Sequence, residues 1–262
     1  MAFNLASIKR GSEILAPRIL LLGPEKAGKT TFAATAPNAL VIPVGQERGV
    51  SQLACAKTDS ANSYLELLDI LNTLCKEKHE FEWVAIDSWS SLEPLIYDHV
   101  CKIEAATSIE KVGGGYGKGV IESMKYAREI IGLLDKLQAK GIGTTVIGHV
   151  KVKEFNDPET QPYTTYQFDV NDRHSSALYR WADAILFLTL KRSIIKKFEG
   201  GYGSETVNAI GTGERVIYTE KRPAHPGGNR YGLPFEIKLP IDAPFAAFED
   251  AMSQSRVVKQ TA

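Results

Sequence analysis

The chain has 262 residues, of which 44% are hydrophobic and 24% charged, and its 31 Lys and Arg residues are balanced by 31 Asp and Glu residues. This composition is typical of a globular protein with an ample core, and the length is compatible with one α/β domain. A net charge of zero excludes a bulk positive field that recruits nucleic acid. Any DNA contact must therefore come from a local cluster or be created by oligomerisation.

Two further features bear on the cellular context. The cysteines Cys55, Cys75 and Cys101 are widely spaced and fit no metal-ligand pattern, which is typical of small core residues in a reducing compartment. No stretch of the sequence is long and apolar enough for a signal peptide or a membrane span. We therefore expect a cytoplasmic protein with no membrane partner.

In chain order, apolar runs alternate with helical periodicity, which predicts a largely parallel sheet with helices on both faces. A capping box of Ser63 and Glu66 predicts one helix start, and a second helix is expected from about Ser90. A third helix is expected between a Gly-rich break at residues 113–119 and Gly141. The expected buried strands are residues 18–22, 39–44, 83–87, 144–148 and 184–188.

The remaining segments carry weaker signals. The polar residues 151–176 are expected to form a long loop, and glycines at residues 200–201 and 211–213 predict turns between short antiparallel strands. The expected organisation is an N-terminal segment at residues 1–17, an α/β domain with a C-terminal antiparallel extension at residues 18–252, and a flexible tail at residues 253–262.

A complete phosphate-binding loop lies between the first strand and the following helix. Its backbone N–H groups point toward one place, where Lys29 can reach the β- and γ-phosphates and the Thr30 hydroxyl can coordinate Mg²⁺. The alternative is a Gly-rich turn that carries Lys and Thr by chance, and the flanking strand and helix signals argue against it. The residues expected to bind ATP are Gly23, Pro24, Glu25, Lys26, Ala27, Gly28, Lys29, Thr30 and Thr31.

Other candidate catalytic residues follow later strands. Asp87 ends an apolar strand and is the natural second residue at the Mg²⁺ site, although it can also cap the following helix. The residue after it is Ser88, so a carboxylate that activates water must come from elsewhere or be absent. Glu47, just past the second strand, is the candidate; its alternative is a solvated pair with Arg48. His149, after the fourth strand, is either a γ-phosphate sensor or a structural polar cap.

Competing classes of phosphate-loop protein are disfavoured by missing motifs. The sequence has no Asn-Lys-x-Asp motif and no Asp-x-x-Gly switch, which argues against a GTPase. It has no Leu-Ser-Gly-Gly motif of the ABC type and no Arg-rich lid of a small-molecule kinase. An ATPase is the class that remains.

Taken together, these motifs resemble the phage-encoded ATPases with a RecA core, a family of phage nucleotide-binding proteins that includes single-strand annealing recombinases. The resemblance implies a RecA-like P-loop NTPase fold, Mg²⁺ and ATP as cofactors, and the host cytoplasm as the location. It runs from about Arg18 to Ala251 and rests on residues 23–34, 46–49, 86–88, 115–119, 155–159, 181–187 and 229–234.

The last of these motifs differs from the family pattern. The family usually has Lys before Asn-Arg, whereas this chain has Gly228 before Asn229 and Arg230. In RecA-like enzymes, basic residues in this region reach the nucleotide of the adjacent subunit. The resemblance therefore implies this trans role for Arg230, and a structural ion pair is the alternative.

The function that these features favour is Mg²⁺-dependent ATP hydrolysis by a protein that assembles into a ring or filament and acts on single-stranded DNA in phage recombination or replication. One candidate DNA loop has Lys111, Tyr116 and Lys118 in a Gly-rich frame, which suits backbone contacts and one stacking platform. For each DNA segment the alternative is a solvated or subunit-contact loop. The second segment, residues 151–176, offers Lys151, Lys153, Phe155, Tyr163, Tyr166, Arg173 and His174.

Two other functions stay open on the sequence alone. One is a nucleotide-switched interaction protein that hydrolyses little ATP and binds no DNA. The other is a ring helicase. A single-strand DNA-binding protein is a candidate further partner.

Overall fold

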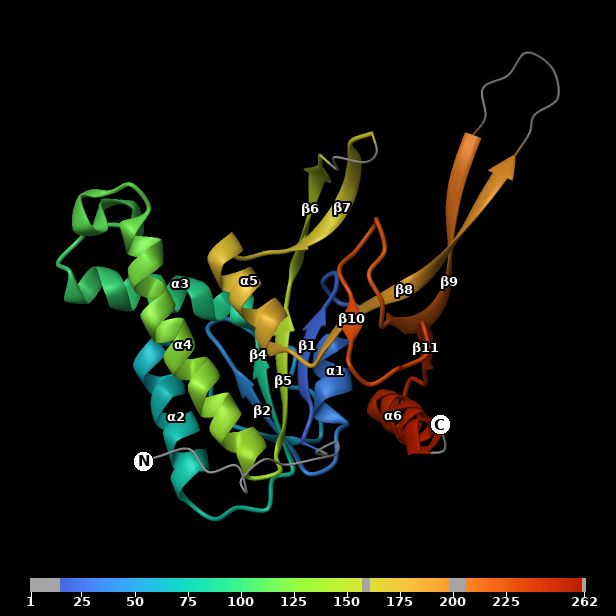
Figure 1. Ribbon diagram of the computed structural model, residues 1–262, viewed down its shortest axis with the longest axis horizontal. Coiled ribbons are helices and arrows are strands. Elements are labelled where there is room, and N and C mark those ends of the chain that lie inside the picture. The colour runs from blue at the N-terminus through green and yellow to red at the C-terminus, as the bar shows by residue number, and fades with distance from the viewer. Residues whose placement is uncertain (1–14, 157–160, 198–205, 261–262) are drawn as a thin grey trace, which may run out of the picture.

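Residues 15–156, 161–197 and 206–260 are described by a computed structural model (Figure 1). The predicted turn at residues 200–201 and most of the motif at residues 155–159 therefore lie outside the described residues. Within these residues, no helix is long and apolar enough to cross a membrane. The strands of the main sheet are β1 (Arg18–Leu22), β2 (Ala39–Pro43), β3 (Ala56–Lys57), β4 (Trp83–Asp87), β5 (Gly143–Gly148), β8 (Ala184–Lys197), β9 (Thr206–Tyr218), β10 (Gly228–Asn229) and β11 (Glu236–Leu239).

The main sheet is parallel in its larger part and antiparallel at one side. The strand order is β11–β9–β8–β1–β5–β4–β2–β3, and β10 pairs with β8. The strands from β8 to β3 in this order are parallel, whereas β9, β10 and β11 pair in antiparallel fashion. The α/β fold with a C-terminal antiparallel extension, predicted from the sequence, is thus confirmed.

Strand β1 lies in the middle of the sheet and is covered on both faces. Its alternate residues enter two separate cores, Leu20 and Leu22 in one and Ile19 and Leu21 in the other. A continuous apolar run is the expected sequence of a strand buried in this way. The two cores explain why all four side chains are inaccessible to solvent.

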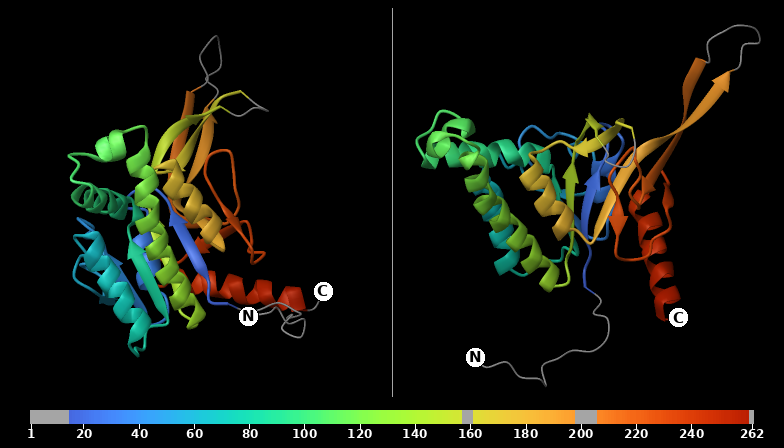
Figure 2. Two further views of the ribbon diagram at one scale, coloured as in Figure 1. Left: turned by 60° about the vertical axis from the view of Figure 1, so that its left-hand side comes forward. Right: turned by 45° about the horizontal axis from the view of Figure 1, so that its top comes forward.

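Helices cover the two faces unequally (Figure 2). The larger group packs on the face of Leu20, and the smaller group packs on the face of Ile19, where Phe32 contacts Phe245 with ring centroids 5.0 Å apart. The larger group is α2 (Tyr64–Lys76), α3 (Trp89–Ile103), α4 (Lys118–Ala139) and α5 (Asp172–Trp181), and the smaller group is α1 (Lys29–Ala34) and α6 (Pro244–Gln260).

The helix boundaries follow the capping residues. The Ser63 side chain accepts a hydrogen bond from the Glu66 backbone N–H and begins α2, as predicted. Helix α3 begins directly after Ser88, earlier than expected, because the Ser88 hydroxyl accepts the backbone N–H of Ser91. Helix α4 ends before Gly141, whose φ of +85° is the left-handed conformation that glycine accommodates.

The prediction of one long loop over residues 151–176 is wrong. Strands β6 (Val150–Phe155) and β7 (Tyr163–Phe168) form a separate antiparallel pair that extends from the end of β5, and α5 follows (Figure 1). Helix α5 has a side-chain cap, because the Asn171 side chain accepts the backbone N–H of Arg173. Strand β6 is largely exposed, and its apolar–polar alternation covers only the four residues from Val150 to Lys153, which is a weak strand signal.

Two other expectations about the C-terminal part also differ from the structure. Residues 211–213 form no turn between short strands but lie inside β9, where the pairing with β8 shifts register between Leu190 and Arg192. An irregularity of this kind absorbs extra residues within a long antiparallel pair. The tail predicted at residues 253–262 is mostly helical, because α6 continues to Gln260 from a segment whose Phe245, Phe248 and Met252 are buried.

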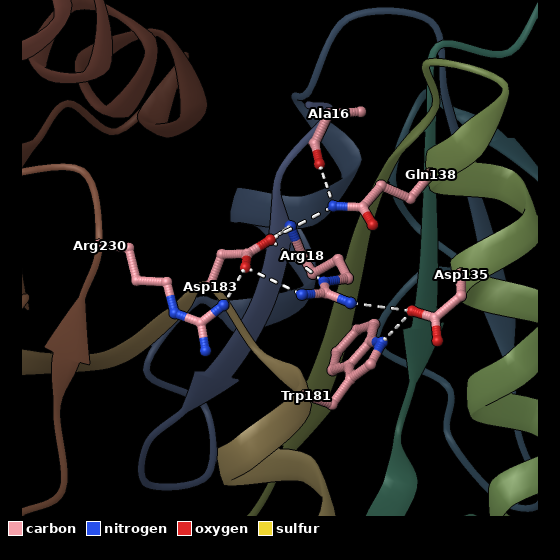
Figure 3. A network of polar contacts seen from close by, with 7 residues as sticks. All are labelled: Ala16, Arg18, Asp135, Gln138, Trp181, Asp183 and Arg230. Carbon is pink, nitrogen blue, oxygen red and sulfur yellow. Dashed lines mark hydrogen bonds and ion pairs between the residues drawn. The ribbon is translucent and has the colours of Figure 1, made fainter. Parts of the chain in front are cut away.

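A network of ion pairs holds the N-terminal end of β1 (Figure 3). The Arg18 guanidinium contacts both Asp183 carboxylate oxygens, at 3.1 and 3.0 Å, and Asp135 at 3.0 Å. The Asp135 carboxylate also accepts the Trp181 indole N–H. Arg230 contacts the Asp183 carboxylate at 2.9 Å from another side. This network connects β1, α4, the start of β8 and the segment after β10.

Replacing Asp183 tests the importance of this network. The side chains of Arg18 and Asp183 are only 19% and 12% exposed, so Asp183→Ala leaves a largely buried guanidinium without its main partner. We expect the free energy of unfolding in a denaturant titration to fall by about 3 kcal/mol. Asp169→Ala, which breaks an exposed pair with Lys151, is the matched control and should cost less than about 1 kcal/mol. If both variants lowered the free energy of unfolding equally, the network would contribute no more to stability than an exposed ion pair.

Candidate functional site

The candidate site lies at the edge of the sheet where the parallel strands end. The loops after β1, β2, β4 and β5 all reach this edge, which is the usual position of ligand sites in open α/β sheets. They line a cavity of about 550 Å³. Its lining residues are Glu25, Lys26, Gly28, Lys29, Thr30, Thr31, Gln46, Glu47, Gly49, Asp87, Ser91, His149 and Arg215.

The phosphate loop holds its lysine inside the turn. Lys29 is 5% exposed, and its ammonium donates hydrogen bonds to the carbonyl oxygens of Gly23 and Pro24, both at 2.8 Å. Burial lowers the pKa of Lys29. Two glycines permit this path: Gly28 has a φ of +109°, and a Cβ at Gly23 would lie 2.1 Å from the Leu188 carbonyl oxygen. The positions of both glycines are therefore fixed by sterics.

Thr30 and Asp87 meet at one side of the loop. The Thr30 hydroxyl donates a hydrogen bond of 2.7 Å to the Asp87 carboxylate, which is almost inaccessible to solvent. Burial is the main cause of a raised pKa at Asp87, and the Thr30 hydrogen bond opposes it. The two groups supply oxygen donors of the kind that Mg²⁺ takes when it also binds substrate phosphates. Among the described residues, no three or more His, Cys, Asp or Glu side chains are grouped so that they could hold a metal ion by themselves.

Glu47 is the centre of a second polar cluster. One of its carboxylate oxygens accepts hydrogen bonds from the hydroxyls of Ser88 and Ser91, at 2.8 and 2.9 Å, and lies 2.8 Å from Nε2 of His149. These contacts, chiefly the one with His149, lower the pKa of Glu47 to about 2. The carboxylate is therefore ionised at neutral pH. The expected alternative, a solvated pair with Arg48, is not the arrangement found.

His149 links this cluster to the end of β5. Its backbone N–H donates a hydrogen bond of 3.0 Å to the Ser90 hydroxyl, which fixes the chain as it leaves the sheet. Its Nδ1 is buried and lacks a hydrogen-bond partner among the described residues. One cavity is thus lined by residues that come from separate parts of the sequence: Glu47, Asp87, His149 and the phosphate loop.

Sequence reasoning missed Arg215. This residue lies on β9 and lines the cavity beside the phosphate loop. In the strand order, β9 is on one side of β1, whereas β5, β4 and β2 are on the other. In the sequence, Arg215 follows the glycines at residues 211–213, which predicted a turn. In the structure, its position depends on the pairing of β9 with β8, in which Arg215 lies opposite Leu190. No local motif marks it, so only the register of a long antiparallel pair could have placed it.

Arg230 is outside this cavity. It lies with Asp183 at the start of β8, whereas the phosphate loop follows the end of the neighbouring parallel strand β1 (Figure 3). Within one chain, Arg230 therefore forms the ion pair that was its structural alternative. The predicted role toward a neighbouring subunit stays a prediction.

The predicted DNA residues lie on two segments that are apart from each other in Figure 1, the first beside α3 and α4 and the second including the β6–β7 hairpin. In the first, which joins the 3₁₀ helix η2 (Ile109–Gly114) to α4, Tyr116 is 99% exposed, and the Lys118 ammonium donates to the Gly113 carbonyl. In the second, Lys153 and Arg173 are exposed, and Lys151 forms an exposed pair with Asp169.

One member of the second segment is not at the surface. His174 is fully buried, where Nδ1 accepts the Trp89 indole N–H and Nε2 lies 3.0 Å from the Ser123 hydroxyl. Burial lowers its pKa to about 4. The sequence interpretation of His174 as a DNA residue is therefore wrong, because it faces the core from the helix α5 that the sequence did not predict.

Comparison with known proteins adds one finding. No curated protein matches the chain. The family AAA_24, described as an AAA domain, matches residues 15–231. This range contains the phosphate loop, Asp87, Glu47, His149 and Arg215, which are the residues that meet in the cavity. The chain belongs to the AAA domain family and is a P-loop ATPase domain of this type.

Proposed function

We propose that the protein binds Mg²⁺-ATP in this cavity and hydrolyses it to ADP and inorganic phosphate. The observation that carries the proposal is the meeting of Lys29, the Thr30–Asp87 pair and the Glu47–His149 cluster in one cavity. These are a cation for the phosphates, oxygen ligands for the metal and a carboxylate for a water molecule, which are the parts that phosphoryl transfer to water requires.

Each group then has a distinct task. Lys29 exchanges the Gly23 and Pro24 carbonyls for β- and γ-phosphate oxygens, because a phosphate is the stronger acceptor for an ammonium group. Thr30 and Asp87 would hold Mg²⁺, which would supply positive charge to the β- and γ-phosphates. Glu47 accepts a hydrogen bond from the attacking water and so directs its oxygen at the γ-phosphorus, where the bond to the β–γ bridging oxygen breaks.

The low pKa of Glu47 limits its role. A carboxylate whose pKa is about 2 is a weak proton acceptor, so it orients water better than it deprotonates water. The hydroxyls of Ser88 and Ser91 fix the direction of this carboxylate. His149 connects the same oxygen to the end of β5, so a change at the γ-phosphate has a direct route to the β6–β7 hairpin.

We propose single-stranded DNA as the partner and recombination or replication of a phage as the setting. Two places on the surface support this. Tyr116 offers an unpacked ring beside Lys111 and Lys118, and on β6 the apolar Val152 is 62% exposed next to Lys153. An exposed ring with nearby cations suits base stacking and phosphate contacts without sequence preference. The motif resemblance favours annealing or strand pairing by a homo-oligomer.

Self-assembly would place Arg230 beside the nucleotide of another subunit. Its side chain is 63% exposed despite the contact with Asp183, so it is accessible to a second copy of the chain. In the proposed assembly, DNA-binding segments of successive subunits join, which compensates for the zero net charge of each chain. A single-strand DNA-binding protein is the further partner that such an activity would meet.

Lys29→Ala tests the nucleotide site. The Lys29 ammonium donates its hydrogen bonds to carbonyls of its own loop, so the variant should fold normally and lose measurable ATP binding in a calorimetric titration. Circular dichroism of the variant is the control for folding. A folded variant that binds ATP as tightly as the parent would refute the assignment.

Glu47→Gln tests the orientation of water. The amide keeps the shape but loses the negative charge, so ATP turnover should fall by roughly 10²–10⁴-fold while ATP binding is retained. Steady-state phosphate release is the measurement. If ATP turnover fell by less than about threefold, Glu47 would have only a structural role, and His149 would be the next residue to test.

Two variants of the Gly-rich loop separate charge from stacking. Combined replacement of Lys111 and Lys118 by Ala should reduce the slope of log affinity against log salt by about 0.7 for each lost phosphate contact on single-stranded DNA. Tyr116→Ala should cost about 1–3 kcal/mol with little change of slope, because stacking releases no counterions. Fluorescence anisotropy with a labelled oligonucleotide measures both.

Assembly and turnover distinguish the rival functions. Sedimentation with an ATP analogue, without DNA, shows whether a loop variant fails only through lost assembly. If both loop variants bind DNA like the parent, the β6–β7 hairpin becomes the candidate DNA surface. Negligible turnover with no DNA binding by the parent would indicate a nucleotide-switched interaction protein, and directional unwinding would indicate a helicase.

A further inference from the structure

Arg215 enters the nucleotide cavity from the antiparallel side of the sheet. It lies on β9 opposite Leu190 of β8, at the point where the β8–β9 pairing becomes irregular and the pair extends beyond the sheet (Figure 1). The Leu188 carbonyl on the same part of β8 is against Gly23, so β8 brings β9 alongside the phosphate loop. The position of Arg215 is therefore set by the same close packing that shapes the loop.

The side chain of Arg215 lies directly over the phosphate loop. A Cβ added at Gly28 would be 3.1 Å from Nε and 3.3 Å from Cδ of Arg215. Nε is buried and has no hydrogen-bond partner among the described residues. A buried N–H of a charged group that lacks an acceptor is costly, and Arg215 also lines the cavity. An acceptor bound in the cavity would remove this cost when the guanidinium turns toward it.

The positions of the charged residues around the cavity indicate that this acceptor is an anion. Glu47 and Asp87 line the β2 and β4 side, whereas Arg215 lines the side of β9, on the other side of β1. An anion seated on the phosphate loop lies between them and can accept from Arg215 without displacing Glu47 or His149. The planar guanidinium presents several N–H donors in a fixed fork that matches phosphate oxygens.

We propose that Arg215 binds the phosphate chain of the nucleotide held by its own subunit. This inference rests on the proposed nucleotide site and adds a residue to it. Within the phosphate loop, Lys29 is the cation that points into the turn, and Arg215 would be a second cation from another strand. The guanidinium donates to phosphate oxygens from the side opposite the Glu47–His149 cluster. The contact is made within one chain, in contrast to the role proposed for Arg230.

Affinity measurements with a base-free probe test this assignment. In calorimetric titrations of the full chain, Arg215→Ala should weaken Mg²⁺-ADP, a non-hydrolysable Mg²⁺-ATP analogue and inorganic triphosphate alike, by about 10-fold or more, as expected for lost hydrogen bonds to charged groups. Arg215→Lys should recover part of this loss, since it keeps the charge but loses the fork. Lys238→Ala is the matched control: it removes an exposed cation of the neighbouring strand β11, outside the cavity, and should bind like the parent.

The possible outcomes separate this inference from the proposed function. If the parent binds the ATP analogue and a folded Arg215→Ala variant binds it equally well, the Arg215 assignment is overturned and the nucleotide site stands. If the variant loses affinity for the analogue but not for inorganic triphosphate, Arg215 contacts the nucleoside and the phosphate assignment is wrong. A parent that binds none of the three probes would overturn the nucleotide site and Arg215 together.

Mixing two variants tests whether the contact is made within one chain. Lys29→Ala and Arg215→Ala proteins each lack one cation. If Arg215 acts within its own subunit, equimolar mixtures should show no high-affinity sites beyond those of the separate proteins. Recovery of parental affinity in a fraction of the sites would show that Arg215 reaches the nucleotide of a neighbouring subunit, and would overturn the inference.

Discussion

Strand β1 is the element on which the rest of the structure depends. Its apolar side chains enter both cores, its N-terminal residue Arg18 is bound by Asp183 and Asp135, and its C-terminal end continues into the phosphate loop. A strand held in this way cannot slide or rotate without breaking buried contacts. The loop therefore begins from a fixed point, and the Leu188 carbonyl against Gly23 fixes its first residue as well.

The electrostatics of the cavity follow from what each carboxylate contacts. Glu47 accepts hydrogen bonds and stays ionised to about pH 2, whereas burial raises the pKa of Asp87. Because the pKa of Glu47 falls from 4.5 to about 2 on folding, its stabilising contribution is complete above about pH 4.5 and is lost as the pH falls toward 2. The surroundings thus shift the pKa values of the two carboxylates in opposite directions, down at Glu47 through hydrogen bonds and up at Asp87 through burial.

The sequence predicted those parts of the molecule that are encoded locally. Buried parallel strands are continuous apolar runs, and the phosphate loop, the Ser63 cap and Gly141 are short patterns whose geometry is fixed by sterics and hydrogen bonds. The β6–β7 hairpin was not predicted, because the apolar–polar alternation of β6 covers only four residues in a segment that is otherwise polar. The register of β8 and β9, and with it Arg215, depends on pairing between distant residues, for which a single sequence has no local signal.

The six-residue helix α1 gives the phosphate loop an unusual dependence on the end of the chain. Phe32 of α1 packs against Phe245 and Phe248 of α6, and the Thr35 hydroxyl accepts the backbone N–H of Phe245. A helix of this length has little stability of its own in water. During synthesis, the phosphate loop emerges before the residues of α6 that pack against its helix, because Phe245 follows Thr35 by 210 residues. A nascent or C-terminally cleaved chain that lacks α6 therefore carries the complete loop motif without the contacts that support α1.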